Sequence, residues 1–333
     1  NIDQWLSGPY DSATKATIED LIAKGDQTTL TDSFYKSLEF GTGGMRGEMG
    51  VGSNRMNKYT VGAATQGFAN YLNASFPGQK IKVAIAHDSR NNSPEFTRIA
   101  ADIFTANGIE VYLFPALRPT PQLSFTVRHL GCQAGIVITA SHNPKEYNGY
   151  KAYWEDGAQV VAPHDENIIK EVQKITSFEQ VNWNKQDELI HYIEEDFDAI
   201  YLGRVKELSL SKDAILSQKS MPIVFSPIHG ASGKMVPDAL RAFGFENIQI
   251  QEKELLAYGT KRLLEIEGLK IYGTAKDKTS VISFNIEGIH PYDIGTIIDK
   301  LGIAVRTGHH CAQPIMDFFK IPGTIRASFA FYN

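Results

Sequence analysis

The stretch 81–139 constrains the fold most strongly, because short apolar runs alternate in it with segments of helical periodicity. Three of the apolar runs are typical of buried strands, at 81–86, 110–114 and 135–139. Between them, segments 93–107 and 120–130 carry apolar residues on one helical face, each with a proline in the first turn and a glycine after the last. This strand–helix–strand–helix–strand order with short links predicts an α/β layer with right-handed crossovers.

Polar residues follow each predicted strand at its carboxyl end. Asp88, Ser89 and Arg90 come after the first strand, Arg118 after the second, and Ser141 after the third. In sheets of this kind, ligands bind beyond the carboxyl ends of the strands. The sequence therefore predicts a ligand site at this edge of the sheet.

The rest of the chain supplies further elements and suggests three parts. Helices are expected at 58–75, 163–176, about 186–208 and 232–242, and strands at 222–225 and 246–250. From about residue 251 a compact α+β unit is expected, with helices at 253–266, 291–301 and 312–319 and strands at 269–272, 280–286, 303–306 and 324–331. We therefore divide the chain into 1–205, the opening βαβ of a second domain at 206–251, and a small C-terminal domain at 252–333.

Composition narrows the class of protein. At 42% hydrophobic and 21% charged residues, the chain is typical of a globular protein that needs no membrane. Its net charge of -5 argues against a nucleic-acid partner. The chain has 2 cysteines, Cys132 and Cys311, and no secretory signal, so we expect a reducing compartment and place it in the cytoplasm. Because it begins at Asn1 and stops at Asn333 directly after a strand-like run, we expect both ends to be cut.

The loop Thr139–Pro144, with the sequence TASHNP, carries the most specific chemistry. Asn-Pro is ordinary turn chemistry, so the loop by itself is consistent with a plain turn. Alternatively, the hydroxyl of Ser141 accepts a phosphoryl group, whose charge of about -1.5 to -2 needs cations around it. Candidate partners for such a phosphate are His142, Lys151, Arg46 and Arg90.

Several motifs in residues 1–250 together resemble the α-D-phosphohexomutases, and within them phosphoglucomutase and phosphomannomutase. The motifs are Phe40–Gly47 (FGTGGMRG), Asp88–Arg90, Arg118–Pro121, Thr139–Pro144 and Asn148–Lys151 (NGYK). The resemblance implies the first domain of that family and the start of its second domain. It also implies transfer of a phosphoryl group from Ser141 to either end of a hexose monophosphate, through a hexose bisphosphate.

The resemblance assigns roles to individual residues. Ser141, His142, Lys151 and Arg46 would be catalytic, and Lys151 is the better candidate for acid–base work because an amine changes protonation state and a guanidinium does not. Thr42, Arg46, Arg90 and Arg118 would bind the substrate. The glycines around Thr42 form either an anion-binding nest or a plain turn. The sequence does not distinguish glucose from mannose as the sugar.

The family's metal site is incomplete in this chain. The resemblance implies Mg²⁺ held by the phosphate of Ser141 and by three aspartates of a D-x-D-x-D-R loop, and no such loop is present. The pair Asp196 and Asp198 lies in an acidic segment that we interpret as a solvated helix face. We therefore expect impaired turnover.

Residues 252–333 resemble a second family, the small C-terminal domain of cysteine desulfurases of the class V aminotransferase fold. The motifs are Gly288–Pro291, Arg306–Pro314 (RTGHHCAQP) and Arg326–Phe329. The resemblance implies that Cys311 carries sulfur as a persulfide for an acceptor protein and that Arg326 binds a carboxylate. It also implies pyridoxal phosphate, whose Schiff-base lysine and cofactor domain are missing here. Without the resemblance, two interpretations of Cys311 are open: the nearby Arg306, His309 and His310 favour its thiolate, or it is a buried cysteine beside structural histidines.

Three hypotheses remain open for the whole chain. It is a phosphohexomutase fragment, a binding module that grips phosphosugars without turnover, or a sulfur-carrying domain that uses Cys311 with a partner protein. The junction near Gln251 has no linker, and it is either a natural fusion or an assembly artefact.

Overall fold

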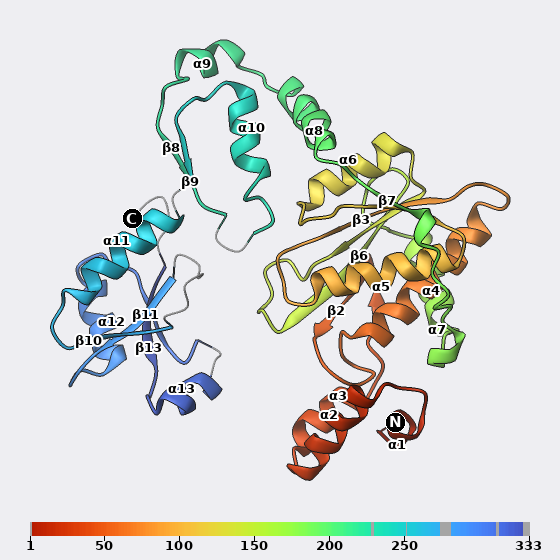
Figure 1. The fold of residues 1–333 in the computed structure, drawn as a ribbon, viewed down its shortest axis with the longest axis horizontal. Helices are drawn as coiled ribbons and strands as arrows, with labels where there is room; N and C mark the ends of the chain where they lie inside the picture. Colours follow the sequence, from red (N-terminus) through yellow and green to blue (C-terminus); the bar gives the residue numbers. More distant parts are fainter. Residues whose placement is uncertain (1, 228–229, 251, 274–280, 311–312, 329–333) are drawn as a thin grey trace. The chain divides into compact units, whose positions relative to one another are not determined.

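The computed structural model describes residues 2–227, 230–250, 252–273, 281–310 and 313–328 (Figure 1). The chain forms two compact units, residues 1–205 and 206–333. Each unit has its own sheets and its own hydrophobic core. Within the described ranges, no helix is both long and apolar enough to cross a membrane.

A seven-stranded sheet is the centre of the first unit, with the order β1-β2-β6-β5-β3-β4-β7. Its strands are β1 (Phe40–Gly41), β2 (Gly44–Glu48), β3 (Lys82–His87), β4 (Glu110–Leu113), β5 (Ala134–Ile138), β6 (Tyr147–Trp154) and β7 (Ile190–Tyr192). The parallel strands β3, β4 and β5 are the three predicted from the apolar runs. The predicted α/β class is therefore confirmed.

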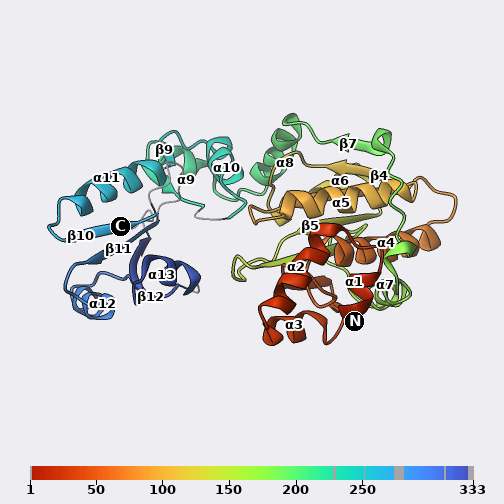
Figure 2. The same ribbon diagram turned by 60° about the horizontal axis from the view of Figure 1, so that its bottom comes forward.

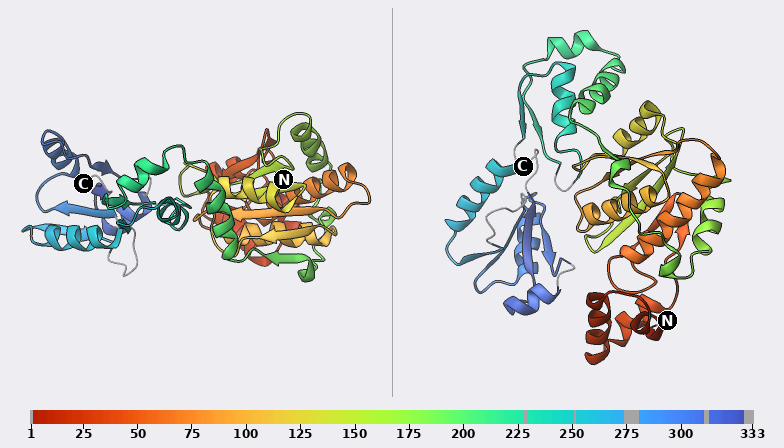
Figure 3. Two further views of the ribbon diagram at one scale, coloured as in Figure 1. Left: turned by 90° about the horizontal axis from the view of Figure 1, so that it is seen from above. Right: turned by 45° about the vertical axis from the view of Figure 1, so that its right-hand side comes forward.

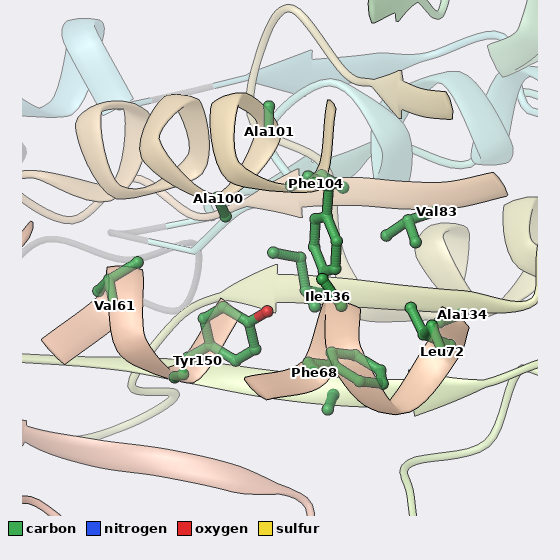
Figure 4. Packing of buried hydrophobic residues seen from close by; sticks show 14 of the residues in the cluster. Val61, Phe68, Leu72, Val83, Ala100, Ala101, Phe104, Ala134, Ile136 and Tyr150 are labelled. Carbon is green, nitrogen blue, oxygen red and sulfur yellow. The ribbon is translucent and has the colours of Figure 1, made fainter. Parts of the chain in front are cut away.

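Helices cover both faces of this sheet because its central strands are buried on both sides. The helices are α4 (Lys58–Ser75), α5 (Ser93–Ala106), α6 (Thr120–Leu130), α7 (His164–Gln173) and α8 (Asp196–Glu207). Residues of α4 and α5 pack with Val83 and Ile136 in one core cluster (Figure 4). Residues of α6 and α8 pack with Ala84 and Val137 in the other. Members of the two clusters alternate along β3 and β5, as the period of 2 in a strand requires.

Short-range capping fixes where the longest helix begins. The side chain of Asn57 accepts the backbone N–H groups of Tyr59 and Thr60, and the hydroxyl of Thr60 accepts the N–H of Asn57 in return. This reciprocal arrangement satisfies donors that a helix start otherwise leaves without partners. It is one reason why α4 begins where the sequence predicted.

A group of N-terminal helices precedes the sheet: α1 (Ile2–Ser7), α2 (Ser12–Ala23) and α3 (Gln27–Phe34) (Figures 2 and 3). Its core joins Trp5, Ile18 and Phe34 to Tyr59 of α4. Asp11 caps α2 and also accepts a hydrogen bond from the Tyr59 hydroxyl, so the helix start is tied to α4. This attachment places β1 and β2, which follow directly, against the rest of the unit.

The predicted helix at about 186–208 was wrong in its first half. Residues Asp187–Leu189 form a short 3-10 turn and Ile190–Tyr192 form β7, which pairs in parallel with β4. Helix α8 begins only at Asp196. The side chain of Ile190 packs against the core at the sheet edge, and that pairing outweighs the helical pattern of the neighbouring acidic residues.

The second unit contains two small sheets. Strands β8 (Ile223–Phe225) and β9 (Ile248–Ile250) form a two-stranded parallel sheet with α9 (Lys212–Ser217) and α10 (Met235–Phe243) in the same segment. A four-stranded antiparallel sheet has the order β10-β11-β13-β12. Its strands are β10 (Leu269–Tyr272), β11 (Val281–Ile286), β12 (Arg306–Gly308) and β13 (Thr324–Ser328).

One face of the four-stranded sheet carries the core of this part. Ile282, Phe284 and Ile325 pack there against residues of α11 (Glu252–Leu264) and α12 (Pro291–Asp299). Helix α13 (Gln313–Phe319) precedes β13. The α+β character agrees with the sequence analysis, whereas β12 lies at 306–308 rather than at the predicted 303–306.

Candidate active site

Ser141 lies in the loop that leaves the carboxyl end of β5, as the sequence predicted. Its backbone is left-handed, with φ of 57°. This region is disfavoured for residues with a Cβ atom. The side chain is exposed, and Oγ lies 3.5 Å from Nδ1 of His142, which is exposed as well. A conformation of this kind, held at a sheet edge, is a feature of functional loops.

Asp88 connects three segments beneath this loop. Its Oδ1 accepts hydrogen bonds from the Ser93 hydroxyl at 2.8 Å and from the backbone N–H of Arg90 at 3.0 Å. Its Oδ2 accepts the Thr139 hydroxyl at 2.6 Å. The Thr139 oxygen in turn accepts the backbone N–H of Ser141 at 3.0 Å. The carboxylate therefore fixes the start of the serine loop against β3.

Each nitrogen of the Arg90 guanidinium has a partner within the protein. It donates to four carbonyl oxygens. Those of Ser141 (2.8 Å), Asn143 (2.6 Å) and Pro144 (2.6 Å) belong to the serine loop, residues 139–146, and that of Tyr147 (3.0 Å) is at the start of β6. The Nε of Arg90 lies 3.2 Å from Asp88 Oδ2, and only 12% of the side chain is exposed. The prediction that Arg90 binds the substrate is therefore corrected, because its donors hold the loop instead.

The pairing of β2 with β6 brings two predicted cations together. Arg46 lies opposite Gly149, and Lys151 lies opposite Gly44. Opposite residues of an antiparallel pair share a face, so both cations project from the outward face as diagonal neighbours, roughly 7–8 Å apart at Cα. Met45 and Tyr150 alternate with them and are buried.

A cleft of about 640 Å³ opens beside these strands. Its lining includes Thr42, Arg46, Thr139 and Lys151, so it joins three of the predicted site residues. Ser141 and His142 are not part of the lining. A hydrogen bond of 3.0 Å from Arg46 Nη1 to Asn143 Oδ1 connects the cleft with the serine loop. The loop that carries Ser141 is therefore tied through Asn143 to one of the cations of the cleft.

Two further cations line the cleft but are already paired. Arg55 lies 2.6 Å from Asp32, and Lys36 lies 3.6 Å from Glu39. Sequence reasoning did not single them out. Among the ion pairs of the described residues, neither Arg46 nor Lys151 has a carboxylate partner. These two side chains are therefore the cations that the cleft offers to an anionic ligand.

The glycines around Thr42 have a structural reason. Gly44 has a φ of 136°, and a Cβ there would lie 1.9 Å from the Tyr150 carbonyl oxygen. Gly149, opposite Arg46, would place a Cβ 2.6 Å from the carbonyl oxygen of Thr139. Close approach of the backbones of β2, β6 and the serine loop therefore requires glycine at both positions. This accounts for Gly44 without an anion-binding nest.

Arg118 and Asp198 form a buried ion pair. The guanidinium Nε and Nη2 donate to the two carboxylate oxygens, each at 2.9 Å, and Gln122 donates to the same carboxylate at 2.7 Å. Arg118 and Asp198 are 4% and 3% exposed. The prediction that Asp198 lies on a solvated face was therefore wrong, and the Arg118 guanidinium, which was predicted to bind the substrate, donates to this buried carboxylate instead.

The residues present do not fit a magnesium site. Mg²⁺ prefers several oxygen ligands in near-octahedral geometry. Across the ranges that the structure describes, no group of three or more His, Cys, Asp or Glu side chains is arranged to hold a metal ion. Asp88, the carboxylate beside the serine loop, is engaged through both oxygens.

In the second unit, Cys311 lies outside the described residues. Arg326, on β13, lies opposite Ser283 of β11 and Arg306 of β12. Neither neighbour can form the Schiff base that pyridoxal phosphate needs, so these residues do not complete a cofactor site. Burial lowers the pKa of His310, whose Nε2 lies 3.0 Å from the Thr324 carbonyl oxygen, and the positive charges of Arg326 and Arg306 act in the same direction.

Known proteins resemble the two parts of the chain separately. Residues 37–179 match the family model described as "Phosphoglucomutase/phosphomannomutase, alpha/beta/alpha domain I", and residues 230–333 match "Aminotransferase class-V". A probable phosphoribomutase of Schizosaccharomyces pombe is 37% identical over 249 residues, 73% of this chain and 42% of that protein. A phosphoglucomutase of Staphylococcus epidermidis is 35% identical over 244 residues, 72% of this chain and 44% of that protein. The chain thus spans about two fifths of the length of these curated relatives.

A solved structure supports the fold alone. The putative phosphomannomutase from Thermus thermophilus matches with a TM-score of 0.51 and 22% identity, over 80% of this chain and 61% of that chain. The relatives extend the resemblance from hexose phosphate mutases to a phosphoribomutase, and the second match is to the class-V aminotransferases as a whole rather than to the desulfurases. Residues 37–179 therefore form an α/β/α domain I of the phosphoglucomutase/phosphomannomutase type, and residues 230–333 are similar to part of a class-V aminotransferase.

Proposed function

We propose that the first unit accepts a phosphoryl group on Oγ of Ser141 from a sugar bisphosphate, in the manner of phosphohexomutase-type transfer. The observation that carries this proposal is the left-handed, exposed Ser141, whose loop is hydrogen-bonded through Asn143 to Arg46 of the cleft that also contains Lys151. Phosphoryl transfer depends mainly on positioning and on neutralising the charge of the phosphoryl oxygens. The serine loop supplies the positioning, and Arg46 and Lys151 supply the positive charge that neutralises the phosphoryl oxygens.

The roles of the residues follow from their chemistry. The Ser141 oxygen forms the new bond to phosphorus as the bond from phosphorus to the sugar oxygen breaks. The proton leaves Oγ and reaches the departing sugar oxygen, with Lys151 as the group that can relay it. Arg46 keeps its charge throughout and neutralises the phosphoryl group. His142, with Nδ1 3.5 Å from Oγ, is positioned to contact the phosphoserine.

The substrate class is a sugar phosphate and its bisphosphate. Hexose phosphates are favoured by the motifs of the serine and glycine-rich loops, and the similarity to a phosphoribomutase adds pentose phosphates to the class. We place this chemistry in the cytoplasm, a proposal supported by Cys132, which is a free thiol in the first unit.

Incubation with glucose 1,6-bisphosphate is expected to add one phosphate to Ser141. A single transfer needs no turnover, so it accumulates over a long incubation even if each event is slow. Intact-mass and peptide mass spectrometry would count and locate the phosphate. The S141A variant should gain none, whereas S89A, which changes an exposed serine of the neighbouring loop, should gain one. Phosphate mapped only to other residues would refute the assignment.

For the second unit we propose that the thiolate of Cys311 takes a sulfur atom from the persulfide of a donor protein, whose cysteine leaves as a thiolate, and passes this sulfur on to a thiol of an acceptor protein. The support is the RTGHHCAQP motif within the class-V aminotransferase match, and the position of Arg326 opposite Arg306 on the four-stranded sheet is consistent with it. The finer identification as a desulfurase and its pyridoxal phosphate rest on this motif.

The two thiols are expected to differ in reactivity. Cys132 is 1% exposed, and burial raises the pKa of its thiol to about 12. At pH 8 only about one such thiol in 10,000 is ionised, so limiting iodoacetamide should label Cys132 much more slowly than Cys311. Labelling in urea, where both thiols are accessible, provides the control. Preferential labelling of Cys132 in the native protein would withdraw Cys311 as the reactive thiol.

A further inference from the structure

We infer that Arg90 and Thr139 are positioning residues that hold Ser141 in its left-handed conformation and so aim its hydroxyl at the phosphoryl donor. This inference deepens the proposed function and rests on it. It gives Arg90 a role different from substrate binding and brings in Thr139, a residue to which sequence reasoning assigned no role.

The backbone of Ser141 is held on both sides. Its N–H donates to the Thr139 hydroxyl oxygen at 3.0 Å, and its carbonyl oxygen accepts from Arg90 Nη2 at 2.8 Å. A residue with a Cβ adopts a φ of 57° only where its surroundings impose it. These two bonds lie on either side of the φ and ψ bonds of Ser141, so they restrain its conformation directly.

Asp88 links the two residues that restrain Ser141, because it contacts both Thr139 and Arg90. It accepts the Thr139 hydroxyl at 2.6 Å and lies 3.2 Å from Arg90 Nε. The Thr139 hydroxyl therefore donates to Asp88, and its lone pair faces the Ser141 N–H. Because the hydroxyl proton is committed, Thr139 acts here as an acceptor with a fixed direction.

The four carbonyl contacts require a planar, branched donor. Arg90 reaches carbonyl oxygens across the loop from residue 141 to residue 147 with its two terminal nitrogens. A lysine at this position has one nitrogen with three donors and cannot span the same set. Charge alone therefore does not replace Arg90.

The test is single-turnover phosphorylation of Ser141 by glucose 1,6-bisphosphate in R90K, T139V and T139S. We expect the rate constant at saturation to fall about 10-fold or more in R90K and T139V, because these variants lose the orientation of the Ser141 hydroxyl but keep the affinity for the bisphosphate. The conservative T139S, which keeps the hydroxyl, should restore the rate to within about 3-fold. The half-saturating concentration should stay within about 2-fold in all three. A raised half-saturating concentration with an unchanged rate constant would overturn the inference in favour of substrate binding.

A second measurement needs no phosphorylation. Lys145 is exposed within the loop that Arg90 holds, so trypsin should cut after it about 10-fold faster in R90M than in the wild type. R98M is the matched control, an arginine on α5 whose ion pairs with Asp102 and Asp187 lie outside this loop. Should R90M unfold as a whole, T139V serves in its place.

The two measurements separate the ways of failing. A wild type that is never phosphorylated, together with faster cutting in R90M or T139V, would refute the proposed function but keep the loop restraint. Equal cutting in the wild type, R90M and T139V would refute the restraint itself.

Discussion

Replacing Arg118 by methionine is expected to lower the free energy of unfolding of the first unit by about 3–5 kcal/mol. The pair with Asp198 is bidentate and almost completely buried, at 4% and 3% exposure. Removal of the arginine takes the bidentate cationic partner away from a buried carboxylate that also accepts a hydrogen bond from Gln122. Urea unfolding followed by fluorescence of the first unit's tryptophans measures the change. Since a domain has only about 5–15 kcal/mol in total, a loss of this size is a large fraction of its stability and should lower the midpoint of urea unfolding clearly.

Two variants control this prediction. R98M removes a partly exposed arginine, and because the side chains of Arg98 and Asp102 are 37% and 24% exposed, the loss should be about 0–1 kcal/mol. The double variant R118M/D198L removes both charges together and should recover much of the loss, because the buried carboxylate is removed along with its cation. Equal stability of R118M and the wild type would show that Arg118 and Asp198 do not depend on each other.

Mutase turnover by this chain is expected to stay at the background of the S141A variant, even with Mg²⁺ present. The charge on the transferred phosphoryl group is met by Arg46 and Lys151, while the described residues offer no carboxylate set for a metal. Metal stabilisation is worth several kcal/mol at such a centre, so a deficit of roughly 10³-fold or more against a complete mutase is expected. A coupled assay of glucose 6-phosphate formation from glucose 1-phosphate measures it.

The control for this assay is the phosphoserine itself. The same preparation should carry phosphate on Ser141 after incubation with the bisphosphate, which shows that the first unit is folded and accepts the phosphoryl group, so that neither folding nor the loading of Ser141 accounts for the missing turnover. Mg²⁺-dependent isomerisation well above the S141A background would contradict the prediction.

Local patterns predicted the centre of the first unit well. Strands β3, β4 and β5 are short apolar runs, and α5 and α6 each have a proline in the first turn and a glycine shortly after the last residue. All of this information is local, so it is readable from the sequence. The position of Ser141 beyond β5 follows from the same pattern.

Long-range pairing was not readable. Strand β6 holds Asn148 and Gly149 at buried positions, so its pattern is not that of an ordinary strand, and its partner β2 lies about a hundred residues earlier. In each strand an apolar residue is followed by a cation: Met45 by Arg46 in β2, and Tyr150 by Lys151 in β6. The apolar residues are buried and the cations are more exposed, so this pattern could have predicted that the two cations share a face.

The two corrected arginines have a common cause. Arg90 and Arg118 were placed correctly at the sheet edge, but their partners lie 51–57 and 80 residues later in the chain. An arginine that follows a strand binds either a ligand or a carbonyl or carboxylate group of the protein itself. Both kinds of partner are recognised through the same charge and geometry. Only the folded structure shows which partner is present.

The strand order of the first sheet has a consequence for how the protein is made. Its central strands are close in sequence, whereas β2 pairs with β6 through Gly44 and Lys151 only after more than a hundred further residues have been synthesised. Contacts between residues so far apart form late, because closing a long loop costs entropy before any pairing rewards it. The cleft cations Arg46 and Lys151 therefore meet only near the end of folding. During translation, Arg46 leaves the ribosome long before its neighbouring strand exists.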